Sequence, residues 1–383
     1  MTELPALPAS FKVESEFPIV RRWTFFNHAG VAPISARAAA AIGEFAQQAR
    51  DDAYLTGHWY RRAEVVRRLS ARLINAAPEE IAFVKNTSEG LSFVANGLDW
   101  KPGDRIVSSS VEYPSNVYPW MAVAQRHGVR HVMVPEKNGR IELEDVLAAA
   151  SDGPTRLLAL SQVEYASGFQ HDLRRIGQFC RSRGIYLCVD GIQACGALPV
   201  DVQGMNIDFL SADGHKWMLG PEGAGFFFCR RELLDRLRPE IGWMNVINAD
   251  DYGHYDFTLK PDARRFECGS YNIGGLLGLG ASLELILEVG METITGRLLA
   301  LTDYLCERLA DKGYRVVSSR RAGEQSGIIS FTSRKHDQHQ LIGWLQDQRI
   351  VIVLRENRLR ASPHFYNSIA DMDRLVDALP LDR

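Results

Sequence analysis

Short apolar runs alternate with amphipathic segments along most of this chain. The runs at 81–84, 105–109, 131–135, 156–163, 185–190, 207–212 and 224–229 predict strands. Uninterrupted apolar runs are typical of strands that are covered on both faces, and helical patterns separate most of the earlier ones. We therefore expect an α/β domain built on a mostly parallel sheet of about seven strands.

The pattern changes after a helical run at 275–290. Residues 297–311, 338–347 and 370–379 predict helices, and "YRVVSS", "GIISFT", "IVIVLR" and "RLRAS" predict strands between them. A chain of 383 residues exceeds the size of one hydrophobic core, so two domains are expected. We expect a large domain over 21–290 and a small C-terminal α+β domain over 291–383, with residues 1–20 packed on the latter.

Charge and composition favour a small-molecule ligand. Lys and Arg number 44 against 47 Asp and Glu, for a net charge of −3, whereas nucleic-acid-binding proteins usually carry a basic surface. No apolar run reaches the length of a membrane span, and the first residues lack a signal-peptide pattern, so no membrane partner and a cytoplasmic location are expected.

No metal site is expected. His336 and His339 are spaced for one helix face, but their polar neighbours favour a solvated surface. The six cysteines form no CxxC pair, and those inside apolar runs are expected to be buried free thiols.

Asp190 and Lys216 each follow an apolar strand. Ligands of open α/β sheets bind at the carboxyl ends of the strands, so an acid and an amine from two such ends could meet at one ligand. Pyridoxal 5′-phosphate uses this pair: the lysine forms a Schiff base, and the carboxylate holds the ring nitrogen protonated. A structural Asp–Lys salt bridge is the alternative.

Two further segments fit the same cofactor. Thr87 and Ser88 begin a helical pattern, and a helix N-terminus with hydroxyl groups is suited to bind phosphate. Tyr113 follows the strand at 105–109 and offers an aromatic ring that could stack on a pyridine ring.

In order and spacing, these segments resemble the class V aminotransferase group of fold-type I pyridoxal-phosphate enzymes, which includes cysteine desulfurases, selenocysteine lyases and isopenicillin N epimerase-like proteins. The resemblance covers nearly the whole chain. It rests on the segments "FFNHAGVAP", "NTSEGLSFVANGL", "VEYPSNVYPW", "LSQVEYASGFQHDL", "VDGIQACGALPVDV", "DFLSADGHKWMLGPEGAGFF", "RRFECGSYNIGGLLGLGASL" and "LRASPHFYNS".

The resemblance implies a role for each matching residue. Lys216, Asp190 and Tyr113 would be catalytic; the residues that bind the cofactor would be Thr87, Ser88, Tyr113, Tyr165, Asp190, Gln193, His215 and Lys216. Gly269 and Ser270 match a glycine–hydroxyl pair that reaches the neighbouring subunit's cofactor, which implies a homodimer. Arg360 would bind the substrate α-carboxylate, with Arg355 as a second candidate. Asn27, His28, His58 and Trp59 are guesses for the wall around the substrate side chain.

Three departures from the desulfurases bear on the reaction. The segment "IVIVLRENRLRAS" lacks the loop cysteine on which a persulfide forms, and Cys268, the nearest cysteine, is expected to be buried and inert. Asp213 replaces a serine beside the phosphate and is expected to turn away or to bond His215. Tyr165 replaces an asparagine.

An enzyme acting on the α-amino group of an amino acid is therefore expected. Because the desulfurase loop is missing, transamination is the first choice. C–S or C–Se bond cleavage is the second, epimerisation the third, and a non-enzymatic binding protein on the same fold is the remaining alternative.

Overall fold

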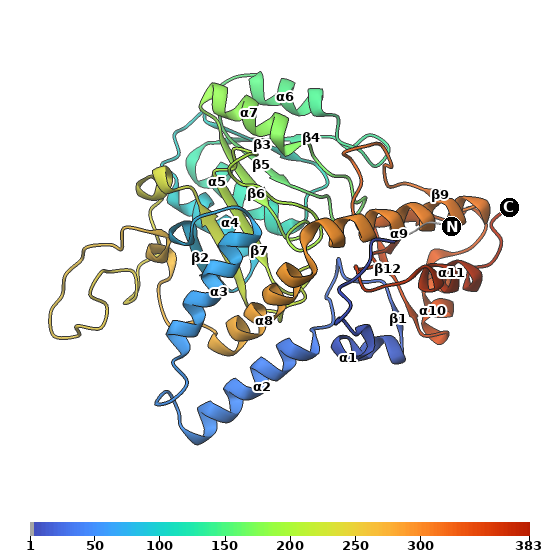
Figure 1. Ribbon diagram of the computed structural model, residues 1–383. Coiled ribbons are helices and arrows are strands. Elements are labelled where there is room, and N and C mark those ends of the chain that lie inside the picture. Colours follow the sequence, from blue (N-terminus) through green and yellow to red (C-terminus); the bar gives the residue numbers. More distant parts are fainter. Residues whose placement is uncertain (1–3) are drawn as a thin grey trace.

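The computed structural model describes residues 4–383, and its centre is a seven-stranded sheet (Figure 1). The strand order is β2-β8-β7-β6-β5-β3-β4, and only β8 runs antiparallel to its neighbours. The predicted mostly parallel sheet is confirmed. Its strands are β2 (Ile81–Val84), β3 (Arg105–Ser109), β4 (Arg130–Val134), β5 (Thr155–Ser161), β6 (Tyr186–Asp190), β7 (Phe209–Asp213) and β8 (Gly225–Cys229).

Helices cover both faces of this sheet, which explains why its strands are apolar throughout. Along β2, Ile81 and Phe83 join one hydrophobic cluster with α6, α7 and α8, and Ala82 and Val84 join another with α4 and α5. The helices up to this point are α1 (Val13–Glu16), α2 (Ala36–Asp51), α3 (Trp59–Leu73), α4 (Thr87–Gly97), α5 (Tyr118–His127), α6 (Leu143–Ser151), α7 (Leu173–Arg183) and α8 (Ile273–Val289).

The C-terminal unit is an α+β arrangement with its own four-stranded antiparallel sheet, in the order β12-β13-β10-β9. Its elements are α9 (Met291–Asp311), β9 (Arg315–Val316), β10 (Ile329–Thr332), α10 (Gln338–Asp347), β11 (Ile350–Val351), β12 (Val353–Arg355), β13 (Arg358–Ala361) and α11 (Ile369–Ala378). Two predictions need correction. "YRVVSS" forms only a two-residue strand, and "IVIVLR" is divided between β11 and β12, which belong to different sheets.

The N-terminal segment lies against the C-terminal unit. Strand β1 (Thr24–Phe25) pairs in parallel with β11, so these residues join the C-terminal unit although they follow residue 21. Phe17 stacks on Tyr366 with ring centroids 4.0 Å apart, and Phe11 lies 5.7 Å from Phe365. The part of the predicted N-terminal arm before residue 4 lies outside the described residues, and the domain boundaries stay a prediction.

Within residues 4–383, no single helix is long and apolar enough to cross a membrane. Helices α8 and α9 satisfy the requirement only as a pair, which is bent by 80°.

Candidate active site

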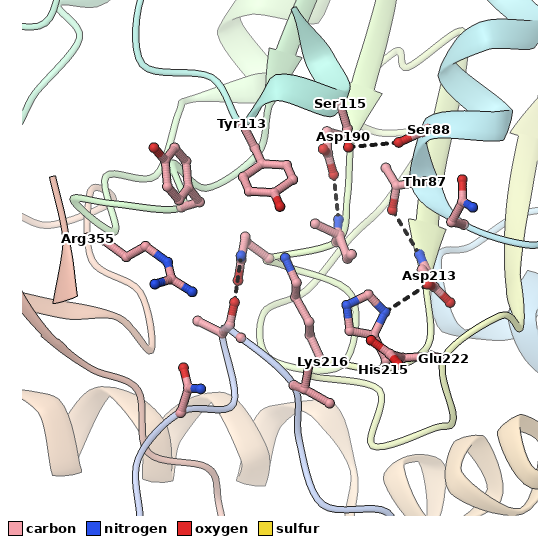
Figure 2. A pocket seen from close by; sticks show the side chains of 18 of the residues that line it. Thr87, Ser88, Tyr113, Ser115, Asp190, Asp213, His215, Lys216, Glu222 and Arg355 are labelled. Carbon is pink, nitrogen blue, oxygen red and sulfur yellow. Dashed lines mark hydrogen bonds and ion pairs between the residues drawn. The ribbon is translucent and has the colours of Figure 1, made fainter. Parts of the chain in front are cut away.

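One cavity of about 320 Å³ lies at the carboxyl ends of the sheet strands (Figure 2), and Arg355 of β12 and Arg360 of β13 are among the residues that line it. Because β2, β3, β5, β6 and β7 all run in the same direction, the segments that follow them meet at this edge. The residues that line the cavity are Asn27, Ala29, Gly30, Val31, Asn86, Thr87, Ser88, Tyr113, Ser115, Tyr165, Asp190, Ile192, Gln193, Asp213, His215, Lys216, Glu222, Arg355 and Arg360.

Lys216 and Asp190 meet in this cavity from neighbouring strands. Asp190 is the last residue of β6, and Lys216 lies in the turn that follows β7. Burial lowers the pKa of Lys216 to about 8, against the opposing effect of Asp190, and burial raises the pKa of Asp190 to about 6. In the described chain no ion pair within 4.0 Å joins the two groups, so they do not form the simple salt bridge that the sequence left open.

One aromatic ring lies near the lysine, and a second ring packs against the first. The Lys216 ammonium nitrogen, Nζ, lies 5.4 Å from the centroid of the Tyr113 ring, and Tyr165 packs edge-on against Tyr113 at 5.3 Å. The Tyr165 hydroxyl donates a hydrogen bond of 3.0 Å to Glu356 Oε1, and burial followed by the charge of Glu356 raises the pKa of Tyr165 to about 12. Tyr165 therefore remains a neutral hydrogen-bond donor near neutral pH.

Hydroxyl and imidazole groups gather at the end of the cavity where α4 begins. The Ser88 hydroxyl donates to Ser115 Oγ over 2.8 Å, and the Asp213 backbone N–H donates to Thr87 Oγ1 over 3.1 Å. His215 Nδ1 lies 2.8 Å from Asp213 Oδ2, so the expectation that Asp213 bonds His215 is confirmed. These donors and the first turn of α4 make a site suited to a phosphate group.

Gln193 lines the cavity with its amide already engaged. Its Oε1 accepts from the indole N–H of Trp217 over 2.8 Å, and its Nε2 donates to the Ala29 carbonyl over 3.1 Å. Contact with a cofactor oxygen through this residue stays a prediction. The contact with Trp217 could not be predicted from the sequence, because it depends on how the turn after Lys216 folds back.

Arg360 is a buried cation that pairs with no carboxylate among residues 4–383. It is 1% exposed, donates through Nη1 to the Tyr165 carbonyl over 2.7 Å and through Nη2 to Asn27 Oδ1 over 3.3 Å, and its Nε has no partner in the described chain. Burial, followed by repulsion from Arg355, lowers its pKa to about 9. Arg355, also in the cavity wall, donates to the carbonyl of Leu354 over 2.8 Å. An anionic ligand would satisfy both guanidinium groups.

Several expected site residues lie elsewhere in this chain. His28 is fully buried, with Nδ1 2.8 Å from the Ser362 carbonyl and Nε2 2.6 Å from the Tyr366 hydroxyl, so both ring nitrogens serve the core and not the cavity wall. His58 is exposed before α3, and Trp59 packs on Phe45. Of the four guesses for the wall around the substrate, Asn27 alone lines the cavity.

Gly269 and Ser270 line a second hollow, together with Lys85, Glu89 and Cys268. Cys268 is exposed, which corrects the expectation that it is buried; the other five cysteines are buried.

Two residues that the sequence analysis did not single out, Ser115 and Glu222, also line the main cavity. Ser115 could have been found from the sequence, because it directly follows the segment "EYP" that contains Tyr113. No sequence pattern pointed to Glu222.

The residues present fit pyridoxal phosphate. A buried amine of lowered pKa faces an aromatic ring, a buried acid lies at the neighbouring strand end, and hydroxyl groups surround a helix N-terminus. The buried Nε of Arg360 lacks a partner that a substrate carboxylate would provide.

Comparisons with known proteins agree with this fit. The model of the family "Aminotransferase class-V" matches residues 24–375. A cysteine desulfurase from Salmonella typhimurium is 30% identical over 397 residues, covering 96% of this chain and 97% of the relative. The solved apo cysteine desulfurase from Thermococcus onnurineus NA1 has a TM-score of 0.89 and 26% identity, covering 98% of both chains.

A second solved structure adds a related activity. It is the cystine C–S lyase C-DES in complex with its reaction product, cysteine persulfide, with a TM-score of 0.86 and 25% identity over 94% of this chain and 98% of that one. C-DES has also been solved as a mutant with glycine covalently linked to its pyridoxal-phosphate cofactor. Family match, fold and cavity together show that this chain belongs to the class V aminotransferase family of fold-type I pyridoxal-phosphate enzymes.

Proposed function

We propose that this protein is a pyridoxal-phosphate-dependent C–S lyase that acts on a cysteine-derived amino acid and releases the sulfur without passing it to a protein cysteine. The observation that carries the proposal is the absence of cysteine from the cavity wall in residues 4–383, in a chain whose relatives include cysteine desulfurases and a cystine C–S lyase. Transamination is the first choice from the sequence, but the relatives reported above are named as cysteine desulfurases or a C–S lyase and do not support it.

The connection between β12 and β13 supports this choice of reaction. It consists of Glu356 and Asn357, both with positive φ, so this two-residue turn next to Tyr165 of the cavity wall offers no thiol. Cys268 lies in the second hollow. In the proposed reaction the substrate C–S bond therefore breaks with its electron pair leaving on the substrate's own sulfur. From cystine and water, the products are cysteine persulfide, pyruvate and ammonia.

Three residues of the chain have separate roles in the proposed reaction. When bound, pyridoxal phosphate stabilises negative charge at the substrate α-carbon. Lys216 holds the cofactor through its amine and, once released, moves the proton at the α-carbon, since no other amine lines the cavity in the described chain. Asp190 keeps the ring nitrogen protonated. Arg360 binds the α-carboxylate through its planar guanidinium, which the burial of its unpartnered Nε favours.

Arg355 favours a substrate with a second carboxylate. Its guanidinium lines the same cavity as Arg360 and donates a hydrogen bond to the carbonyl of the preceding residue, Leu354, which is not an anionic partner. A cysteine disulfide carries one carboxylate on each half, so two guanidinium groups would bind both ends of it. This places cystine ahead of cysteine among the candidate substrates.

A product assay separates the candidate reactions. The holoenzyme is mixed with L-cystine, L-cysteine, L-alanine and L-glutamate without a keto-acid acceptor. Pyruvate and sulfane sulfur are measured, and the final form of the cofactor is read by absorbance and mass. Pyruvate and persulfide from cystine, with the cofactor returned as aldehyde, are expected. Pyridoxamine phosphate with a matching keto acid would instead identify a transaminase, and α-deuterium exchange without cleavage an epimerase.

We also propose a homodimer in which Gly269 and Ser270 reach the cofactor of the partner subunit. Their position in a hollow separate from the Lys216 cavity supports contact in trans, because within one chain they do not line that cavity. Mixing inactive Lys216→Ala chains with Ser270→Ala chains tests this. If Ser270 acts in trans, the active cavity in the mixed dimer gains an intact Ser270, and activity exceeds that of Ser270→Ala dimers. Action in cis predicts no gain.

A further inference from the structure

Two Glu–Tyr pairs form part of the cavity wall. In Glu112–Tyr113 and in Glu164–Tyr165 the tyrosine lines the cavity, whereas the glutamate is buried, at 6% and 1% exposed respectively, and does not line it. The two rings pack edge-on, with centroids 5.3 Å apart. Tyr113 has an extended backbone, in which successive side chains point to opposite sides, so the Glu112 carboxyl lies behind the ring that follows it. A role for Glu112 at the cavity must therefore act through another residue.

Glu112 ties the segment before Tyr113 to the end of β5. Its Oε1 accepts a hydrogen bond from the Ser161 backbone N–H over 2.7 Å, and its Oε2 lies 2.5 Å from the Ser161 hydroxyl oxygen. Ser161 is the last residue of β5 and pairs in register with Asp190, the last residue of β6. Tyr113 and Asp190 are thereby fixed to neighbouring strand ends of one sheet.

The Tyr113 ring depends on this attachment because packing alone holds it weakly. The ring is 45% exposed, and it lies against Tyr165 and 5.4 Å from Lys216 Nζ (Figure 2). On its C-terminal side, Pro114 restricts the backbone of the residue before it. On its N-terminal side, the two bonds of Glu112 hold the chain. Without them the segment before the ring would move more freely, and the ring would move with it.

We propose that Glu112 is a positioning residue that holds the Tyr113 ring in place to stack on the pyridine ring of the cofactor, acting through its two hydrogen bonds to Ser161. The proposal rests on the expected role of Tyr113 and is independent of which substrate bond breaks. Burial, followed by the charge of Glu164, raises the pKa of Glu112 well above its ordinary value. A glutamine can make the same two bonds as a neutral carboxyl, with one acceptor and one donor.

The test measures cofactor-site affinity without catalysis. Apo full-length chain is titrated by calorimetry with pyridoxine 5′-phosphate, which has no aldehyde for Lys216. Tyr113→Ala should weaken binding about threefold to tenfold, the range expected for one aromatic stacking contact. Glu112→Met keeps the volume but loses both bonds to Ser161, and it should weaken binding at least about threefold and no more than Tyr113→Ala does. Glu112→Gln should stay within about 1.5-fold of wild type.

A double-mutant cycle shows whether Glu112 acts through Tyr113. In the Tyr113→Ala background, Glu112→Met should change the affinity by less than about 1.5-fold, because the ring that it positions is absent. The circular dichroism band of the holoenzyme cofactor should shrink in both Glu112→Met and Tyr113→Ala and remain as in wild type in Glu112→Gln. If Glu112→Met does not fold, Ser161→Ala, which removes the hydroxyl bond alone, takes its place in the same cycle with a smaller expected loss.

Glu80 is the matched control. It is also 6% exposed, and its carboxyl accepts from the backbone N–H groups of Ala77 and Arg231 over 3.0 and 3.1 Å, yet it does not line the cavity. Glu80→Met should lower the free energy of unfolding and leave the affinity and the dichroism unchanged. An equal loss of affinity in Glu112→Met with and without the Tyr113 ring would overturn the proposal, as would wild-type affinity in Glu112→Met or in Tyr113→Ala. None of these outcomes bears on C–S bond cleavage, because the titration contains no substrate.

Discussion

Replacing Arg360 by methionine should inactivate the enzyme and at the same time stabilise its fold. The guanidinium is 1% exposed and has no carboxylate partner in the described chain. Burial is the chief cause that lowers its pKa from the ordinary arginine value to about 9, which corresponds to roughly 5 kcal/mol against the charged form. Methionine fills much of the same volume without a charge to desolvate.

The expected gain is smaller than this figure. The substitution removes the hydrogen bonds to the Tyr165 carbonyl and to Asn27 Oδ1, which are worth about 1.5–3 kcal/mol each when the donor is charged. Cavity water can hydrate both acceptors after the change and offset part of that loss. We therefore expect Arg360→Met to raise the free energy of unfolding by about 1–3 kcal/mol near neutral pH.

The sign of the pH dependence follows from the lowered pKa. The unfolded chain holds the Arg360 proton more tightly than the folded protein, so the destabilisation is complete below pH about 9 and is relieved as the pH rises above that value. The stability difference between Arg360→Met and wild type should be constant from pH 7 to pH 8.5 and shrink above pH 9. Thermal and urea unfolding of the holoenzyme measure it.

Arg67 provides the matched control. It is also buried, at 2% exposed, but it pairs with Glu267 at 2.5 Å, and that pairing raises its pKa. Arg67→Met leaves the buried Glu267 carboxylate without its cation, with only the Phe83 N–H and the Tyr271 hydroxyl of the described chain still donating to it, and should cost about 3–5 kcal/mol. Arg360→Met should lower kcat/KM about 10²- to 10⁴-fold, because two charge-assisted hydrogen bonds to the substrate carboxylate are lost. If both variants lose stability alike and Arg360→Met keeps its activity, Arg360 is a structural cation.

Three further predictions concern the cofactor and the sulfur. The pKa of about 8 for Lys216 predicts that attachment of pyridoxal phosphate to the apoprotein, followed by stopped-flow absorbance, speeds up as pH rises to about 8 and then levels off, since only the neutral amine attacks; a rate independent of pH would contradict it. Asp190→Asn should bind cofactor but lower kcat about 10²-fold, and an unaffected kcat would remove Asp190 from the mechanism. Cys268→Ser should cleave cystine at the wild-type rate; loss of cleavage with intact cofactor binding would point to a protein persulfide.

The sequence by itself determined the architecture of the large unit and most of the cavity. Apolar runs such as 81–84 and 105–109 became strands at those residues, because strands covered on both faces need an uninterrupted apolar pattern. Lys216, Asp190, Tyr113 and Ser88 all line one cavity, since the ends of parallel strands meet at one edge of a sheet.

Only the tertiary structure decided which polar residues face the cavity and which serve the core. His28 and Arg360 were both expected at the substrate. Both nitrogens of the histidine bond to Tyr366 and Ser362, whereas no acidic side chain in the described part of the chain pairs with the arginine. These partners lie hundreds of positions away or are missing, so no local pattern records them. Burial and hydrogen-bond partnership arise from long-range packing, which is why the same sequence that fixed the strands left the roles of these side chains open.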